Sequence, residues 1–321
     1  MIKKILVTGG CGFIGSNIAN HFAQKGFKVF VVDNLSVGDR QNLIKSKNIS
    51  FYKADINNIN KINIKDKIDC CIHLAAKAEI MIDKKKEHQY FFDNVLGLQE
   101  VLNYCAEKKV KKFIFASSAS VYGDTLNFKV KENKRKKPLH FYGYTKAIGE
   151  EMVRDYCEIN NIKYYNLRFF NVYGNKSNAV VAKFIAQYLQ NKEITIYGSG
   201  NQSRDFIHVD DIIKIVNLLI KKNIKSNFFN VGSSQNTTIK EIKNLINSKW
   251  KFVNLDKRFD DIEKSISNNN KIKKVLNWSS KIDFKIGIKR MINEDNIRLK
   301  KIKLPSVLGQ KKLIKKFNSQ K

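Results

Sequence analysis

Apolar and polar residues alternate in blocks along the first half of the chain. Short, nearly continuous apolar runs predict strands that are covered on both faces. These runs fall at residues 3–10, 27–34, 49–56, 68–76, 111–118 and 163–171. Between them, apolar positions recur at helical spacing, which predicts helices at residues 13–26, 92–109 and 142–160. Strands and helices in this alternation predict an α/β fold with a doubly wound parallel sheet.

The alternation loosens after about residue 172. Residues 194–220 predict a strand, a polar loop and a helix, residues 228–232 a strand and residues 238–248 a helix. We therefore expect a Rossmann domain and a smaller interleaved C-terminal lobe. The expected bounds are 1–172 for the first domain, with return segments near 205–232, then 173–295 for the second lobe and 296–321 for a basic tail. A solvated or packed extension is favoured for this tail over a weak amphipathic segment on an anionic membrane surface.

The net charge is extreme, at +31 over 321 residues. Nearly all the excess is lysine, which is dispersed apart from short clusters at residues 84–86 and 129–137. No zinc finger, heptad array or aromatic RNA-binding motif accompanies it, so we expect no nucleic-acid partner. The lysine, isoleucine and asparagine content is typical of an AT-rich genome, and a positive surface attracts anionic substrates.

The five cysteines show neither a metal-binding spacing nor a disulfide framework. Cys70 and Cys71 lie together in an apolar run, which favours buried thiols in a reducing compartment. The basic and apolar start of the chain is too short for a signal peptide, and no run is long enough for a membrane helix. We expect a cytoplasmic protein with no integral membrane segment and no metal.

The stretch "VTGGCGFIG" joins the first predicted strand to the first predicted helix. Gly9 permits a tight turn, Gly12 lets the backbone approach a pyrophosphate, and Gly15 lets the helix pack closely on the strand. Asp33 ends the second strand, where a carboxylate accepts hydrogen bonds from ribose hydroxyls and repels a ribose phosphate. This combination predicts a site for NAD rather than NADP.

The two-residue gaps between these glycines, followed by "DNLSVGDRQNL" after the second strand, resemble the extended short-chain dehydrogenase/reductases. The resemblance covers residues 1 to about 292 and points to the NAD-dependent nucleotide-sugar epimerases within that superfamily. By this resemblance Asp55 and Ile56 flank the adenine, and Asn94 lies close behind the cofactor. The other implied cofactor contacts are Phe13, Ile14, Asn34, Leu74, Ala75, Ala76 and Lys77.

"YGYTK" places Tyr142 and Lys146 four residues apart at the start of a helix, and therefore on one face. A phenol has a pKa near ~10 in water, too high for a base at neutral pH. We expect the lysine ammonium and the positive nicotinamide to lower it by about three units, which needs roughly 4 kcal/mol. The resemblance makes both residues catalytic and places both against the cofactor.

The third catalytic member lies in "ASSASVYG". The resemblance places a catalytic Ser or Thr three residues before the Val of "VYG", which is Ser118, with Ser117 the less favoured neighbour. The 4,6-dehydratases of the family carry Asp-Glu just before "VYG", and the decarboxylases carry Glu there. This chain has Ala119 and Ser120, which leaves oxidation at C4 and its reversal, namely epimerisation.

Several motifs of the second half resemble the family's substrate site. The resemblance puts Asn171, Arg204 and Arg258 on the diphosphate, with Tyr197 near the uracil and Asp261 on the ribose. Asp260 stands where the family has glycine. The small Ser265 stands where epimerases restricted to unacetylated hexoses carry Tyr, which favours an N-acetylated sugar.

The sequence therefore predicts an NAD-dependent UDP-sugar 4-epimerase. The favoured substrates are UDP-N-acetylglucosamine and UDP-N-acetylgalactosamine, or else UDP-glucose and UDP-galactose. The alternatives are a UDP-glucuronate 4-epimerase, another nucleotide-sugar oxidoreductase on this scaffold, and a non-catalytic NAD-binding regulatory protein. The resemblance also implies a homodimer through the helices that start near Asn94 and Tyr144.

Overall fold

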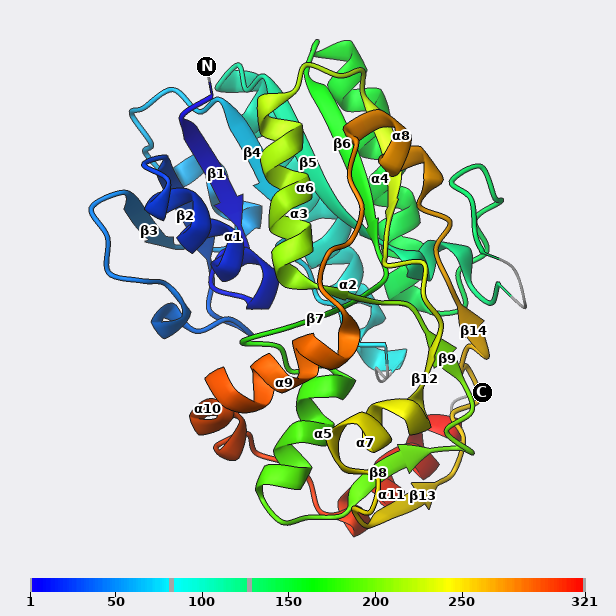
Figure 1. Ribbon diagram of the computed structural model, residues 1–321. Coiled ribbons are helices and arrows are strands. Elements are labelled where there is room, and N and C mark those ends of the chain that lie inside the picture. Colours follow the sequence, from blue (N-terminus) through cyan, green and yellow to red (C-terminus); the bar gives the residue numbers. More distant parts are fainter. Residues whose placement is uncertain (1, 81–83, 126–128, 320–321) are drawn as a thin grey trace.

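Seven parallel strands form the central sheet, in the order β11-β6-β5-β4-β1-β2-β3 (Figure 1). This is a computed structural model that describes residues 2–80, 84–125 and 129–319. The strands are β1 Lys4–Thr8, β2 Lys28–Asp33, β3 Ile49–Lys53, β4 Cys70–His73, β5 Lys112–Ser118, β6 Lys163–Phe169 and β11 Asn227–Val231. The chain runs outward from β1 through β2 to β3, then returns to β4 on the other side of β1. This reversal makes the carboxyl ends of β1 and β4 the switch point, where such sheets bind ligands.

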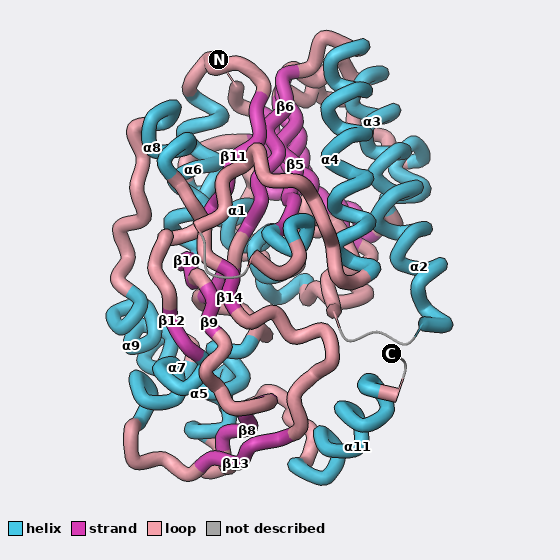
Figure 2. The backbone as a smooth tube through the Cα atoms, turned by 90° about the vertical axis from the view of Figure 1, so that its right-hand side faces the viewer, coloured by secondary structure: helices cyan, strands magenta, loops and turns pink. Residues whose placement is uncertain are grey.

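Helices cover both faces of the sheet, and Figure 2 separates the two layers. One face packs against α1 Phe13–Gln24, α6 Val209–Lys221 and α8 Asn270–Leu276. The other packs against η2 Ile56–Lys61, α3 Gly97–Glu107 and α4 Phe141–Ile159. Along β1, Ile5 and Val7 face the first layer while Leu6 faces the second. Burial on both faces explains why the strands read as continuous apolar runs. The predicted α/β doubly wound fold is confirmed.

The helix predicted at residues 92–109 begins earlier and is not uniform. It starts as α2 Glu87–Phe91, passes through one π-helical segment at Phe92–Leu96, and continues as α3. Short 3-10 helices occur at η1 Arg40–Asn42, η3 Lys84–Lys86 and η5 Ala119–Tyr122. The last of these directly follows β5 and contains the stretch before "VYG".

The second lobe has its own apolar core below the sheet (Figure 1). Its helices are α5 Val180–Leu189, α7 Ile239–Asn247, α9 Phe284–Glu294 and α10 Asn296–Lys300. Its small sheets pair β7 Asn171–Tyr173 with β10 Phe206–His208, β8 Ile194–Tyr197 with β13 Phe252–Leu255, and β9 Ser203–Arg204 with β12 Thr237–Thr238 and β14 Lys264–Ser265. Helix α5 has no counterpart among the predicted elements, although its residues carry strong helical periodicity.

The two lobes interleave through segments that cross between them. Residues 209–231 return to the first lobe as α6 and β11. Helix α8 also packs there, with Ile272 and Leu276 in the core of the first lobe, although it falls within the range expected for the second. Asp205 lies at the crossing, where its buried carboxylate accepts hydrogen bonds from the backbone N–H and hydroxyl groups of Ser233 and Ser267 at 2.5–3.0 Å.

The basic tail contains α10 and a second helix, α11 Val307–Asn318. Ile314 and Phe317 of α11 are buried, while Leu308 and Leu313 are exposed. Figure 2 shows α11 close to the β8–β13 pair of the second lobe. Among the described residues, the tail is thus a packed extension, with its apolar face against protein.

All five cysteines are buried and unpaired. Burial raises the pKa of the Cys11 thiol to about 12, so it remains protonated at neutral pH. Within the described part of the chain, every helix is too short or too polar to span a bilayer.

Candidate active site

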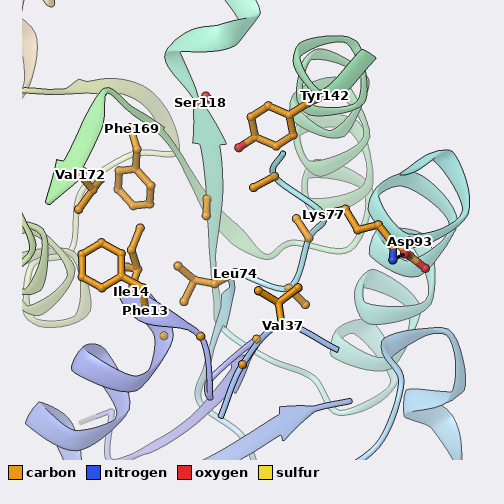
Figure 3. A pocket seen from close by; sticks show the side chains of 18 of the residues that line it. Phe13, Ile14, Val37, Leu74, Lys77, Asp93, Ser118, Tyr142, Phe169 and Val172 are labelled. Atoms are coloured by element: carbon orange, nitrogen blue, oxygen red, sulfur yellow. Dashed lines mark ion pairs between the residues drawn. The ribbon is translucent and has the colours of Figure 1, made fainter. Parts of the chain in front are cut away.

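The carboxyl ends of β1, β2, β4 and β5 border a cavity of about 510 Å³ (Figure 3). It lies at the switch point of the sheet and extends to the start of the second lobe. The predicted residues that line it are Gly9, Gly12, Phe13, Ile14, Gly15, Asp33, Asn34, Asp55, Ile56, Leu74, Ala75, Ala76, Lys77, Ser118, Tyr142, Lys146 and Asn171. These residues come from seven separate segments of the chain, and they converge on one cavity.

The glycine turn leaves space where a dinucleotide pyrophosphate requires it. Gly9 has a φ of 67°, and a Cβ there would lie 2.6 Å from the backbone nitrogen of Ala75. A Cβ on Gly15 would lie 2.2 Å from the carbonyl oxygen of Gly9. A Cβ on Gly12 would approach only that same oxygen, at 3.3 Å, so its other side is open. The turn therefore fits a pyrophosphate at the N-terminus of α1.

Asp33 is held rigidly at the end of β2. Its Oδ2 accepts the backbone N–H of Cys11 at 2.8 Å, and its Oδ1 accepts that of Leu35 at 2.8 Å. Each carboxylate oxygen has a further lone pair. The two backbone bonds fix a carboxylate that lines the cavity, with acceptors available for ribose hydroxyls. The residues present thus fit NAD.

Asn94 supports the cavity wall from behind and does not line it. Its Oδ1 accepts the backbone N–H of Lys77 at 2.8 Å, and its Nδ2 donates to the Lys77 carbonyl at 2.9 Å and to Thr145 Oγ1 at 3.0 Å. Lys77 in turn forms an ion pair with Asp93 at 3.0 Å (Figure 3). These contacts fix the segment after β4 to the helix that carries the catalytic pair.

Ser118 and Tyr142 lie at the end of the cavity away from Val37 (Figure 3), and Lys146 also lines the cavity. β5 ends at Ser118, whose hydroxyl hydrogen-bonds to the Tyr142 phenol. Lys146 is 3% exposed, and its Nζ lies 4.7 Å from the centroid of the Phe115 ring and 5.9 Å from that of Tyr142. The Lys146 side chain therefore lies closer to the Phe115 ring than to the ring of Tyr142.

Without the nicotinamide charge that the expectation includes, the protein does not lower the pKa of the Tyr142 phenol. Burial raises that pKa to about 12, and the hydrogen bond from Ser118 opposes the rise. Burial also lowers the pKa of Lys146 to about 7, against the charge of Glu150, which raises it. Desolvation outweighs pair attraction here because both groups are fully enclosed.

A buried ionic network lies beneath α4, the helix that carries Tyr142 and Lys146, and it was not predicted from the sequence. Glu150 accepts two hydrogen bonds from Arg168, both at 2.7 Å, and one from the Ser117 hydroxyl at 2.5 Å. Arg168 also donates to the Tyr122 hydroxyl at 2.7 Å, which donates to Asn230 at 2.7 Å. The position of Glu150, one helical turn after Lys146, is the feature of the sequence that could have predicted this network.

The residues expected at the nucleotide form a second cluster, outside this cavity. Arg204 and Arg258 each donate to Asp261 Oδ1, at 2.8 and 2.9 Å. Tyr197, at the end of β8, and Ser265, in β14, belong to the same part of the second lobe, and β14 pairs in register with β9. Of the residues expected to bind the substrate, only Ser118 and Asn171 line the cavity. Further lining residues that the sequence analysis missed are Phe169, Phe170, Val172, Ala179, Val180, Val181 and Phe206.

A profile of the NAD dependent epimerase/dehydratase family matches residues 5–232, most of the chain. The chain belongs to this family. Its cofactor is NAD.

Three relatives in this family match over nearly their whole length. The solved UDP-glucose 4-epimerase of Thermotoga maritima, with UDP-glucose, is 30% identical with a TM-score of 0.86, covering 92% of this chain and 100% of its own. The UDP-N-acetylglucosamine 4-epimerase of Methanobrevibacter ruminantium, with UDP-N-acetylmuramic acid, is 30% identical with a TM-score of 0.82, covering 91% and 99%. A UDP-glucuronate 4-epimerase of Thermodesulfobacterium geofontis is 30% identical over 92% of this chain and 97% of its own.

In this member of the epimerase/dehydratase family, the described carboxylates that line the cavity are engaged away from the predicted trio of Ser118, Tyr142 and Lys146. Three carboxylates line the cavity among the described residues, namely Asp33, Asp55 and Asp93. Asp33 accepts from backbone amides, Asp55 accepts from Asn57 and Asn34, and Asp93 pairs with Lys77. Among the described residues that line the cavity, the trio thus has hydroxyls and an amine for proton transfer, and the carboxylates there are bonded to other partners.

Proposed function

We propose that the protein inverts the configuration at C4 of a UDP-sugar through a transient 4-keto intermediate. The observation that carries this is the trio of Ser118, Tyr142 and Lys146, facing a dinucleotide cavity whose carboxylates all have partners elsewhere. Elimination of water needs an additional acid and base, whereas oxidation and reduction at one carbon do not. The three relatives, each named as a 4-epimerase, support the same reaction.

In this proposal Tyr142 removes the proton of the C4 hydroxyl. Ser118 hydrogen-bonds to the phenol and orients the substrate hydroxyl toward it. NAD, when bound, supplies the hydride acceptor and a positive charge near the phenol. The positive charge of Lys146 and that of the nicotinamide then oppose the effect of burial on the pKa of Tyr142.

The return step uses the same residues in reverse. After the keto sugar has presented its opposite face, C4 takes back the hydride from the reduced cofactor, when bound. Tyr142 gives its proton back to the C4 oxygen and is again a phenolate near the charge of Lys146. Glu150, anchored by Arg168, keeps Lys146 charged more readily than burial alone would permit. The chain therefore ends the cycle in its starting protonation state.

For the sugar, we propose UDP-N-acetylglucosamine and UDP-N-acetylgalactosamine. Ser265 is buried in β14, next to the strand that carries Arg204. A small side chain there leaves room that a tyrosine would fill. UDP-glucose and UDP-galactose, or a UDP-uronate, are the alternatives that a substrate panel separates.

The experiment is incubation with a panel of UDP-sugars, with the products identified by NMR. Inversion at C4, lost in Tyr142→Phe and kept in Tyr144→Phe, supports the proposal. Tyr144 is a matched control because it lies on the same helix with its side chain exposed. Loss of water or carbon dioxide from the UDP-sugar would refute the proposed epimerisation. Bound NAD with no turnover of any UDP-sugar would favour a regulatory protein.

We also propose a homodimer, with UDP-sugar as the substrate partner and no nucleic-acid partner. Phe91, Phe92, Leu96, Tyr144 and Ile148 are each 41–52% exposed on α2, the π-helical segment and α4. Exposed apolar side chains on adjacent helices are typical of a subunit interface. Sedimentation of the wild type against Tyr144→Lys tests this, and a monomeric wild type would refute it. The unpaired buried thiols support a cytoplasmic location.

A further inference from the structure

The last helix of the chain holds a short segment of the second lobe, residues 257–259. Asn318, at the end of α11, donates from Nδ2 to the Lys257 carbonyl at 2.9 Å. Its Oδ1 accepts the backbone N–H of Phe259 at 3.0 Å. One side-chain amide therefore satisfies a donor and an acceptor on either side of Arg258, about 60 residues away in sequence.

Apolar contacts reinforce this clamp. The rings of Phe317 and Phe259 stack with centroids 4.9 Å apart and planes inclined by 28°. Phe317 is 7% exposed and Ile314 is fully buried, so the inner face of α11 is covered by protein. The geometry is a docked helix, with both polar and apolar contacts to the same segment.

A second contact reaches the strand end that carries Tyr197. The Tyr197 hydroxyl donates to Gln310 Oε1 at 3.4 Å, and Gln310 Nε2 donates to the Pro305 carbonyl at 3.1 Å. Gln310 lies two turns before Asn318 on α11 and is buried. The helix thus contacts both segments that we assign to the nucleotide end of the substrate.

Arg258 lies within the segment that these contacts hold. Its guanidinium reaches Asp261 at 2.9 Å, where it meets Arg204. Its backbone lies between the two groups that Asn318 binds. Because a planar guanidinium binds a diphosphate through directed N–H groups, a shift of this backbone moves the donors away from the phosphate oxygens.

We propose that α11 is a positioning element of the nucleotide end of the substrate site, acting through Asn318 on Arg258 and through Gln310 on Tyr197. This inference rests on the proposed function, since it takes the Arg204, Arg258 and Asp261 cluster as the UDP clamp. Asn318 does not contact the substrate in this scheme. The amino-terminal cavity for NAD is independent of it, because no residue of α11 lines that cavity.

Thermodynamic linkage gives a reciprocal consequence. If docking of α11 strengthens UDP binding, then UDP must strengthen the docking of α11 by the same factor. Helix α11 contains Lys311, Lys312, Lys315 and Lys316. UDP should therefore slow tryptic cleavage within residues 311–316, whereas NAD should not. Mass spectrometry of the released peptides measures the rate of this cleavage.

The direct experiment measures UDP affinity by calorimetry for Asn318→Leu and for a chain that ends at Lys303. We expect the dissociation constant for UDP to rise about tenfold, because both variants lose the two hydrogen bonds that restrain the segment. KM for the UDP-sugar should rise in parallel, while kcat and bound NAD stay close to wild type. Leu313→Ala, at an exposed position of the same helix, is the control.

Two results would overturn the inference. One is unchanged UDP affinity in both α11 variants while Arg258→Ala weakens it, which would leave the clamp in place without a role for α11. The other is unchanged UDP affinity in Arg258→Ala as well, which would remove the clamp itself. Inversion at C4 by the wild type, measured separately, shows whether the proposed reaction stands in either case.

Discussion

Glu150 and Arg168 form a bidentate ion pair one helical turn below Lys146, with Nε–Oε1 and Nη2–Oε2 distances of 2.7 Å. Both side chains are at most 4% exposed. Lys136 adds a third positive group at the edge, with contacts to Glu150 and Glu151. The pair is fully hydrogen-bonded, which is the condition under which a buried ion pair is tolerated. Its carboxylate supplies the charge that opposes the desolvation of Lys146.

Glu150→Gln should lower the pKa of Lys146 further below about 7, because it removes the charge that raises it. It should also lower the free energy of unfolding by about 3 kcal/mol, since Arg168 is left buried without its partner. NMR titration of the lysine side chains and denaturant unfolding measure the two effects. Ser117→Ala keeps the ion pair and serves as control, with a cost of about 1 kcal/mol. An unaltered Lys146 pKa in Glu150→Gln would contradict the role of this carboxylate.

Ser118→Ala should raise the pKa of Tyr142, because the hydrogen bond from Ser118 lowers it. We expect kcat to fall by about 10²-fold at neutral pH, the lower range for a group that assists proton transfer. The acidic limb of the kcat–pH profile, which reports deprotonation of Tyr142, should move to higher pH. Ser117→Ala is the control, because it removes a neighbouring hydroxyl that donates to Glu150 instead. Equal effects of the two substitutions would exclude a specific role for Ser118.

Asp33→Ala should weaken NAD binding and raise the ratio of NADP to NAD affinity. The substitution removes both the acceptors for ribose hydroxyls and the charge that repels a ribose phosphate. Loss of one charge-assisted pair of hydrogen bonds corresponds to about 10²-fold in affinity. Fluorescence titration with the two reduced cofactors measures both affinities. Asp39→Asn, at a nearby exposed position, is the control. A constant NADP to NAD ratio would show that Asp33 does not discriminate between them.

His73 makes the fold sensitive to acid. Burial lowers the pKa of His73 to about 3, and its Nδ1 lies 2.8 Å from Thr8 Oγ1. The unfolded chain takes up this proton near pH ~6.5, so its contribution to stability is lost as the pH falls from there toward 3, by up to about 1.4 kcal/mol per pH unit. His73→Gln should flatten the pH dependence of the unfolding free energy in that window. His88→Gln, at an exposed site, should not, and equal slopes in all three proteins would disprove the effect.

Ser265→Tyr should reduce kcat/KM for UDP-N-acetylglucosamine far more than for UDP-glucose. The added ring occupies volume at a position that is 6% exposed, and the acetyl group needs that volume. Competition between the two substrates, followed by NMR, gives the ratio directly. Ser265→Thr adds one methyl group and should change the ratio little. An unchanged preference in Ser265→Tyr would place the acetyl group elsewhere.

The parts predicted well from sequence are those that depend on local spacing. The strands appeared as apolar runs because a sheet covered on both faces buries every side chain. Gly9 and Gly15 could be singled out because a tight turn between strand and helix admits no Cβ at these positions. In the structure, a Cβ at either position would clash with backbone atoms. Helix α5 was missed because its residues follow a segment that departs from the motifs of its relatives.

What the sequence determined by itself is therefore the doubly wound fold, the glycine turn, Asp33 after β2 and the four-residue spacing of Tyr142 and Lys146. Only the tertiary structure decided the balance of charges at that pair, since desolvation depends on everything packed around it. It also decided that Asp261 joins Arg204 to Arg258 and that Asn318 holds the segment between Lys257 and Phe259. These contacts join residues far apart in the chain, and no periodicity of the sequence encodes such distances.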